Sequence, residues 1–142
     1  PLICGETLNR LVNERENTGA AGVVLTLVLE DPTGYGRVVR GEDDAVTEIV
    51  EHKDASEEVR KINEVNSGIY CFDASKVFGA LNKVGSDNSQ NEYYLPDVLK
   101  VFISQGEPVR SLVCEDEREV LGVNTVEQLK RVEQIMKERR NG

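Results

Sequence analysis

Gly22-Val-Val-Leu-Thr-Leu-Val-Leu29 is the stretch that decides the fold of this chain. After its glycine it holds only valine, leucine and one threonine, a composition typical of a strand that is buried on both faces. Such strands lie at the centre of α/β sheets, where helices cover both sides. The apolar run is far shorter than the roughly 18 residues that a membrane-spanning helix needs, so it predicts no such helix.

The segments around this strand alternate between helical and extended patterns. Residues 6–16 have apolar positions at helical spacing. Further helices are predicted over 55–61, over 75–81, from Pro96 to the residue before Gly106, and from 125 onward. Arg37–Arg40 and Val46–Val50 predict a β-hairpin, and strands are predicted over 65–72, interrupted by Gly68, and over 109–114. We therefore expect an α/β fold with a mixed sheet, helices on both faces and a hairpin insertion.

Two capping boxes set helix starts in this scheme. Asp54-Ala-Ser-Glu57 predicts a short helix with Asp54 as its N-cap. Thr125-Val-Glu-Gln128 predicts the start of the last helix in the same way.

The amino-acid composition limits the kinds of function that this chain can have. The chain has 142 residues, with 17 Lys+Arg against 26 Asp+Glu and a formal net charge of -9. Hydrophobic residues make up 39% and charged residues 30%, which indicates a soluble globular chain of single-domain size. The acidic balance argues against nucleic-acid binding, which needs a basic face.

The cysteines and the first residues bear on the compartment. Cys4, Cys71 and Cys114 are odd in number, far apart and without CxxC spacing, so we expect reduced thiols rather than a disulfide frame or zinc site. No secretory signal pattern opens the chain. We expect a cytoplasmic protein that does not engage a membrane.

Gly34-Tyr35-Gly36 is the first candidate for chemistry. It does not fit the dinucleotide-binding motif G-x-G-x-x-G, because position 39 is valine instead of the third glycine. In addition, no strand leads directly into a helix at this point. Two interpretations stay open: a plain turn before the hairpin, or a backbone that approaches a ligand closely.

Polar residues at strand ends are the second set of candidates. Glu51-His52-Lys53-Asp54 directly follows a strand, where ligands bind in open α/β sheets, although a solvated charge cluster would look the same. Asn66 lies inside an apolar strand and Asn124 just before a helix cap. Each must be tied to the backbone or offered to a ligand. No spacing supports a nucleophilic triad.

At these residues the sequence resembles a known family. Five motifs occur in order over nearly the whole chain: Asp31-Pro-Thr-Gly-Tyr-Gly-Arg-Val-Val-Arg40, Ile49-Val-Glu-His-Lys-Asp-Ala55, Glu64-Val-Asn-Ser-Gly68, Asp87-Asn-Ser-Gln-Asn-Glu-Tyr-Tyr-Leu95 and Val120-Leu-Gly-Val-Asn124. Together they resemble the N-acetylglucosamine-1-phosphate uridyltransferase (pyrophosphorylase) domain of the bacterial bifunctional GlmU family. The resemblance implies a Rossmann-like nucleotidyltransferase domain with a mixed sheet.

The resemblance also implies an activity in sugar-nucleotide biosynthesis. UTP and N-acetylglucosamine 1-phosphate would give UDP-N-acetylglucosamine and pyrophosphate with Mg²⁺ as cofactor. Gly36 would present its backbone to the sugar, Glu51 would accept hydrogen bonds from its hydroxyls, and Asn66 would bind the sugar nucleotide. Asn124 would bind substrate and Mg²⁺ through its side-chain oxygen.

The family has further parts that this chain does not match. We expect residues 1–142 to be the C-terminal portion of the uridyltransferase domain, without the N-terminal nucleotide-binding half or the C-terminal β-helix acetyltransferase domain. The chain would supply the sugar side, hold no catalytic residue of its own and be inactive alone. Asn91 stands where the family usually has glycine.

Two other functions stay open. The chain could be a non-catalytic assembly module that pairs, through an exposed sheet edge, with itself as a homo-oligomer or with a separate N-terminal half. It could also belong to a nucleotidyltransferase for another sugar 1-phosphate.

Overall fold

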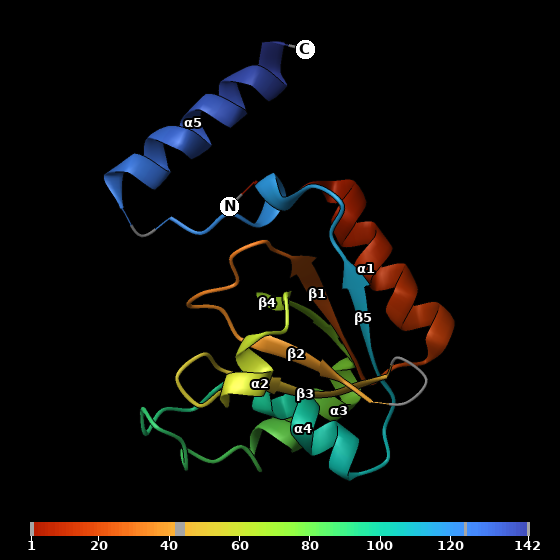
Figure 1. Ribbon diagram of the computed structural model, residues 1–142. Helices are drawn as coiled ribbons and strands as arrows, with labels where there is room; N and C mark the ends of the chain where they lie inside the picture. The colour runs from red at the N-terminus through yellow and green to blue at the C-terminus, as the bar shows by residue number, and fades with distance from the viewer. Residues whose placement is uncertain (1, 42–44, 124, 142) are drawn as a thin grey trace.

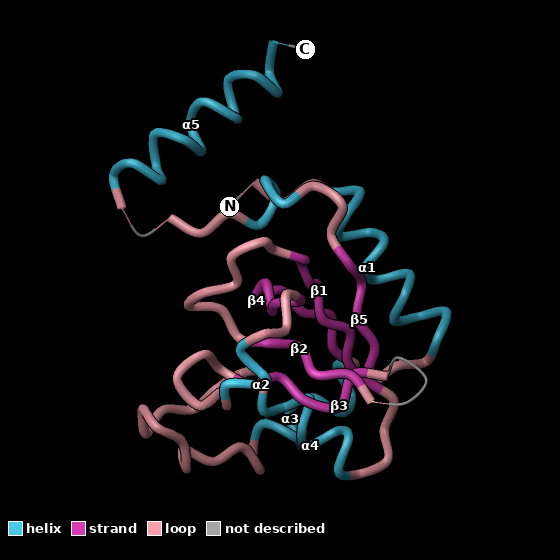
Figure 2. The backbone as a smooth tube through the Cα atoms, in the orientation of Figure 1, coloured by secondary structure: helices cyan, strands magenta, loops and turns pink. Residues whose placement is uncertain are grey.

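A five-stranded mixed sheet forms the body of the protein in a computed structural model that describes residues 2–41, 45–123 and 125–141 (Figures 1 and 2). The strand order is β3-β2-β4-β1-β5. The strands are β1 (Gly22–Val28), β2 (Arg37–Arg40), β3 (Val46–Val50), β4 (Glu64–Phe72) and β5 (Val109–Val113). The helices are α1 (Gly5–Thr18), α2 (Glu57–Arg60), α3 (Ala74–Leu81), α4 (Asp97–Ser104), a 3-10 helix over Glu117–Val120 and α5 (Val126–Asn141). The expected α/β fold is confirmed.

The central strand is β1, as its sequence predicts. It pairs antiparallel with β4 and parallel with β5, which makes the sheet mixed. Val23, Leu25 and Leu27 enter one apolar cluster with Leu11 of α1, while Val24 enters the other with Leu99 of α4. Alternate side chains of one strand therefore supply the cores on both faces of the sheet.

The hairpin forms where the sequence predicts it. β2 and β3 pair antiparallel, with Val38 opposite Ile49, and both side chains are buried. The helix that follows does not begin as expected. Ser56 is the N-cap of α2 and accepts a hydrogen bond from the Val59 amide at 3.3 Å. Asp54 was the wrong N-cap because its carboxylate accepts instead from the Ser89 amide at 3.1 Å.

β4 carries a bulge at the glycine that interrupts its sequence pattern. Its pairing with β1 passes from Val24↔Tyr70 to Thr26↔Asn66, so three residues of β4 lie opposite one residue of β1. Gly68 within the bulge has φ +80°, a conformation that glycine adopts without steric cost.

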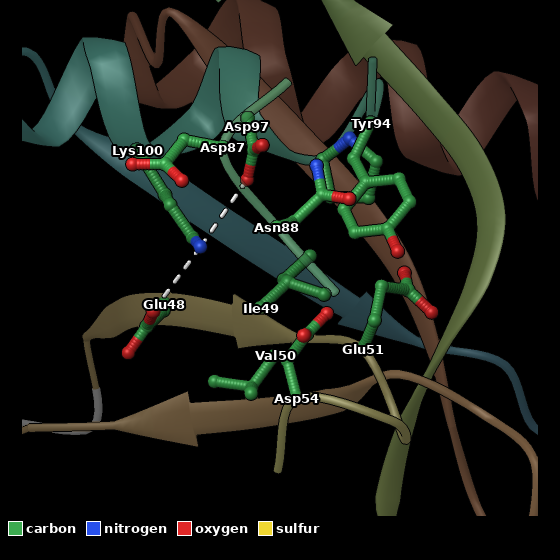
Figure 3. A pocket seen from close by; sticks show the side chains of 11 residues that line it. Glu48, Ile49, Val50, Glu51, Asp54, Asp87, Asn88, Tyr94, Asp97 and Lys100 are labelled. Atoms are coloured by element: carbon green, nitrogen blue, oxygen red, sulfur yellow. Dashed lines mark ion pairs between the residues drawn. The ribbon is translucent and has the colours of Figure 1, made fainter. Parts of the chain in front are cut away.

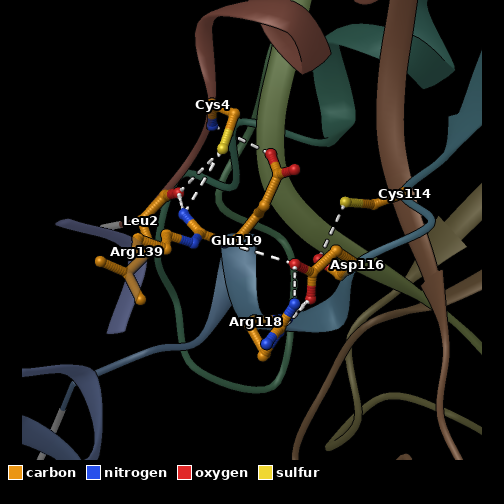
Figure 4. A network of polar contacts seen from close by, with 7 residues as sticks. All are labelled: Leu2, Cys4, Cys114, Asp116, Arg118, Glu119 and Arg139. Carbon is orange, nitrogen blue, oxygen red and sulfur yellow. Dashed lines mark hydrogen bonds and ion pairs between the residues drawn. The ribbon is translucent and has the colours of Figure 1, made fainter. Parts of the chain in front are cut away.

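The last helix leaves the sheet and lies against the N-terminal residues (Figure 1). Thr125 and Gln128 form the predicted capping box, with hydrogen bonds of 3.0 and 3.2 Å. Val132 and Ile135 of α5 pack on Leu2. A polar network adds to this contact, with Arg139 donating to the Leu2 carbonyl at 2.6 Å (Figure 4).

The same network fixes the start of α1. Buried Glu119 accepts a hydrogen bond from the Cys4 amide at 2.9 Å, at the N-cap of the helix (Figure 4).

Cys4, Cys71 and Cys114 are free thiols. Within the described ranges, no helix has the length and apolar content to cross a membrane.

Candidate functional site

Three of the four residues predicted to bind the ligand lie in one row across the sheet. Arg37 of β2 is paired with Val50 of β3, so Gly36 and Glu51 stand next to each other at the open end of the hairpin. A Cβ atom on Gly36 would lie 3.0 Å from Oε1 of Glu51. The Gly36 carbonyl accepts a hydrogen bond from the Asn66 amide of β4 at 2.9 Å. Asn66 in turn is opposite Thr26 of β1.

The row is on one face of the sheet. Side chains two residues apart on a strand point the same way, so Gly36 and Glu51 share the face of Val38 and Ile49. That face holds the apolar cluster that includes Leu99 of α4. The resulting site sits where the apolar core gives way to polar groups at the strand ends.

Asn66 has a side-chain amide whose two ends differ in their hydrogen bonding. Its Oδ1 accepts hydrogen bonds from the Gly68 amide and from the Tyr70 hydroxyl, each at 2.9 Å. Among the described residues, none accepts a hydrogen bond from its Nδ2. The sequence left open whether this side chain bonds to the backbone or to a ligand. In the structure its oxygen is hydrogen-bonded within the protein, and its amide nitrogen has no partner among the described residues.

Glu51 brings a carboxylate to the row. Its carboxylate is half-buried, and burial raises the pKa of that carboxyl above its ordinary value. The nearby charges of Asp54 and Asp97 raise the pKa further, while Lys100 opposes them. The site thus holds a carboxylate that is only partly solvated and already surrounded by negative charge.

Beside Glu51 lies an acidic pocket of about 220 Å³ (Figure 3). Five carboxylates and one amine line it, together with apolar and polar groups from β3, α4 and the loop before α4; the charged residues are Glu48, Glu51, Asp54, Asp87, Asp97 and Lys100. The Lys100 amine is 3.2 Å from carboxylate oxygens of both Glu48 and Asp97, so its charge is already neutralised. The pocket suits hydroxyl donors better than anions.

The polar loop over residues 85–95 is hydrogen-bonded to residues 53 and 54, which follow β3. Lys53 donates to the side-chain oxygen of Gln90, and Gln90 donates to the Tyr94 hydroxyl at 2.6 Å. Asn91 has φ +54°. Asparagine tolerates this left-handed conformation, which glycine adopts freely, better than most side chains do.

Arg37 joins the loops that flank the site. Its side chain is 1% exposed and donates to the carbonyls of Tyr35 and, at 3.3 Å, Arg60. Its Nη2 lies 3.4 Å from Nδ1 of His52. Burial lowers the pKa of the guanidinium. The residue next to Gly36 therefore ties the turn before β2 to the loop that carries Glu51.

Tyr70 and Arg37 adjoin the candidate site, although the sequence did not single out either of them, and Tyr94 lines the acidic pocket. The only available signal was the spacing of Tyr70, which follows Asn66 by four residues with a glycine between them. Asn124, the fourth predicted residue and the predicted Mg²⁺ ligand, lies outside the described residues.

A metal centre is not built by the side chains that the structure describes. In those ranges, no group of three or more His, Cys, Asp or Glu side chains could hold a metal ion. Mg²⁺ is usually held by one or two protein groups together with substrate phosphates, so its expected binding here depends on Asn124 and stays a prediction.

Comparison with known proteins gives the family of the chain. The sequence model described as nucleotidyl transferase matches residues 2–131. The chain is 48% identical over 141 residues to the bifunctional protein GlmU of Bacillus subtilis, and 49% identical over 141 residues to those of Oceanobacillus iheyensis and Clostridium beijerinckii. Each alignment covers 99% of this chain but only 31%, 31% and 30% of the relatives, so the chain spans less than a third of their length.

The matched stretch belongs to the N-terminal part of these relatives. The chain was expected to be the C-terminal half of the uridyltransferase domain; the description as a C-terminal half is wrong, and the matches place a nucleotidyltransferase stretch in the N-terminal part of GlmU.

A solved structure shows the same fold. It is described as a glucose-1-phosphate thymidylyltransferase from Bacillus anthracis in complex with a sucrose. The TM-score is 0.64 at 21% identity, with 90% of this chain and 48% of the other chain covered.

Proposed function

Because this chain belongs to the nucleotidyl transferase family, we propose that it supplies the sugar-binding side of a uridylyl transfer from UTP to N-acetylglucosamine 1-phosphate. The products would be UDP-N-acetylglucosamine and pyrophosphate. The observation that carries the proposal is the juxtaposition of Glu51, Gly36 and Asn66 in one row.

The chemistry of the row favours a sugar. A carboxylate accepts hydrogen bonds from hydroxyl groups, an amide nitrogen donates to a ligand oxygen, and a glycine lets a ring approach the backbone. Glu51, Asn66 and Gly36 offer these three contacts side by side. The raised pKa of Glu51 also fits a neutral partner, because burying that carboxylate beside an anionic group would cost more.

The role of these residues would be to position N-acetylglucosamine 1-phosphate, the substrate that receives the uridylyl group. In the transfer, a phosphate oxygen of the sugar phosphate attacks the α-phosphorus of UTP, a new P–O bond forms and pyrophosphate leaves. A phosphate monoester is already an anionic nucleophile at neutral pH, so no general base is required. Catalysis then comes from orientation and from stabilisation of charge on the phosphates.

We propose further that the chain alone does not catalyse the reaction. A triphosphate needs cationic partners, and Lys100, the lysine among the described residues that line the acidic pocket, already pairs with Glu48 and Asp97. Mg²⁺ and its predicted ligand Asn124 stay predictions of the family resemblance.

An assembly module is the second candidate. Four large apolar side chains are exposed on α3 and the loop before α4: Phe78 at 70%, Leu81 at 40%, Tyr93 at 75% and Leu95 at 45%. In addition, β2 pairs with β4 at a single position, Arg37 opposite Val65, so the remainder of this β4 edge is not paired with β2. Both features would suit a partner chain.

Calorimetric titration separates the candidates. We expect the chain to bind N-acetylglucosamine 1-phosphate, to lose about tenfold or more in affinity with Glu51→Gln, and to keep its affinity with Glu58→Gln. Glu58 is a matched control because it lies on the surface of α2 in an exposed ion pair with Lys61.

Three other results would redirect the proposal. Equal affinity for glucose 1-phosphate would favour another sugar substrate. Concentration-dependent association without sugar binding would favour the module. Pyrophosphate release by the chain alone with UTP, the sugar phosphate and Mg²⁺ would contradict the proposed inactivity.

A further inference from the structure

We propose that Tyr70 is a positioning residue of the site, which holds Asn66 in one orientation so that its amide nitrogen donates to the ligand. This inference rests on the proposed function for the identity of the ligand. It assigns a role to a residue that the sequence reasoning did not single out.

The bulge of β4 brings the two side chains together. In a regular strand, residues 66 and 70 would be separated by two full pleats. Here the bulge shortens that path, because Asn66 and Tyr70 are paired with Thr26 and Val24, which are only two residues apart on β1. As a result, the Tyr70 hydroxyl lies 2.9 Å from Oδ1 of Asn66.

The orientation of the Asn66 amide is fixed by the groups around it. The Gly68 main-chain N–H is 2.9 Å from Oδ1 and can only donate. A flipped amide would set an NH₂ group against that N–H, so the oxygen must face it. The Tyr70 hydroxyl then donates to the same oxygen, and both of its lone pairs are used.

This arrangement leaves the NH₂ group as the part of Asn66 that can bind a ligand. Thr26, its cross-strand neighbour, is fully buried, and its hydroxyl has no hydrogen-bond partner among the described groups, Asn66 included. The site therefore presents one oriented donor, Asn66, and one acceptor, Glu51. A ligand could then bind with one oxygen that accepts a hydrogen bond from Asn66 and one hydroxyl that donates to Glu51.

Tyr70 is itself held rigidly. Its ring stacks on Phe72 with centroids 5.3 Å apart, and Phe72 meets Phe102 edge to face at 6.2 Å. Phe102 is 1% exposed, so this aromatic column begins in the core. Burial and the nearby Glu51 charge raise the pKa of Tyr70, which keeps its hydroxyl a donor at physiological pH.

The test compares Tyr70→Phe with Tyr93→Phe in the full chain. The first removes the hydroxyl but keeps the ring on Phe72, and the second makes the same chemical change on a side chain that is 75% exposed. Two readouts are taken: NMR relaxation of the Asn66 side-chain amide, and calorimetric affinity for N-acetylglucosamine 1-phosphate. Thermal unfolding verifies that each variant is folded.

We expect Tyr70→Phe to increase the mobility of the Asn66 amide and to weaken binding ~3- to 10-fold, as loss of one hydrogen bond would. Tyr93→Phe should change neither. In an Asn66→Ala background, Tyr70→Phe should cause no further loss, because the residue it positions is gone.

The two proposals fail in different ways. If Tyr70→Phe leaves both amide mobility and affinity at wild-type values, the positioning role is wrong while the sugar site stands. If Tyr70→Phe loosens the amide but the wild-type chain does not bind N-acetylglucosamine 1-phosphate, the positioning role stands and the proposed function is wrong.

Discussion

The carboxylate of Glu51 occupies the space beside Gly36 that a side chain at position 36 would enter, across the open end of the hairpin. A methyl group on Gly36 would stand 3.0 Å from Oε1 of Glu51, a distance at which one of the two must move. The absence of a side chain at Gly36 would therefore let the Glu51 carboxylate and the Gly36 backbone contact the same ligand in the proposed site. The proposed sugar site depends on this closeness.

Replacing Gly36 with alanine should weaken sugar binding more than it weakens the fold. The new methyl group would displace the Glu51 carboxylate and fill the space beside it. We expect affinity for N-acetylglucosamine 1-phosphate to fall about tenfold, roughly 1.4 kcal/mol. Stability should change by less than about 1 kcal/mol, because the end of the half-buried Glu51 side chain can turn aside. Calorimetry and urea unfolding measure the two effects.

Gly79→Ala is the control for this substitution. Gly79 lies in α3 with open space around its Cβ position. Alanine there should leave binding unchanged and raise the free energy of unfolding by about 0.5–1 kcal/mol, because glycine is a poor helix former. Unchanged affinity in Gly36→Ala would mean that no ligand approaches Gly36.

The ionisation of Glu51 should cost folding free energy. Its pKa is raised above the ordinary value of 4.5, so the folded chain holds this proton more tightly than the unfolded chain. Below the ordinary pKa both states are protonated and nothing is lost; as the pH rises through the raised pKa, the folded state is destabilised. Glu51→Gln should therefore raise the free energy of unfolding at about pH 7.5 and have no such effect near pH 4. Urea denaturation at both pH values measures this.

Sugar binding should depend on the same proton. Affinity for N-acetylglucosamine 1-phosphate should fall as the pH drops through the raised pKa of Glu51, because the protonated group loses acceptor capacity. The ligand phosphate also titrates, at about pH 6 if it resembles other phosphate monoesters. Glu51→Gln shares that ligand titration, so the difference between the two pH profiles reports Glu51. Parallel profiles would contradict its role as acceptor.

Asn91 should tolerate glycine but not a β-branched residue. Its φ of +54° costs little for glycine and most for a branched side chain. We expect Asn91→Gly to be within about 0.5 kcal/mol of wild type and Asn91→Val to destabilise by about 1–2 kcal/mol. Urea unfolding measures both. Glu92→Val is the control, since Glu92 is an exposed neighbour without positive φ, and equal losses in both valine variants would refute the explanation.

Gly68 should resist substitution for a related reason. Its φ of +80° belongs to the bulge that places Tyr70 on Asn66. Gly68→Ala should lower the free energy of unfolding by about 1–2 kcal/mol and reduce sugar affinity as well. Gly85→Ala, at an exposed loop position with open space and no positive φ, should do neither. Paired urea and calorimetric measurements distinguish the outcomes, and a Gly68→Ala chain with wild-type affinity would separate the bulge from binding.

Local patterns predicted most of the fold. The apolar run of β1, the hairpin and the Thr125 capping box depend on neighbours in sequence, and each forms as expected. Asp54 failed as an N-cap because a distant residue, Ser89, takes its carboxylate. A competing tertiary contact of this kind leaves no trace in local spacing.

The arrangement of the proposed site could not be predicted from the sequence, and its residues stay predictions. The family resemblance singled out Gly36, Glu51 and Asn66, yet their placement in one row follows from the strand order β3-β2-β4-β1, which brings segments far apart in sequence together. The sequence predicted that Gly68 interrupts β4. It did not predict the bulge that brings the Tyr70 hydroxyl to the Asn66 side chain. The burial of Arg37 was equally invisible, because charged side chains are expected at the surface.

The most direct measurement is a map of backbone and side-chain amide shifts during titration of the chain with N-acetylglucosamine 1-phosphate. We predict saturable shifts centred on the amides of Gly36, Glu51 and Gly68 and on the Asn66 side chain, and their loss in Glu51→Gln but not in Glu58→Gln. Saturable shifts confined to other parts of the chain, or none at millimolar ligand, would contradict a sugar site in this row.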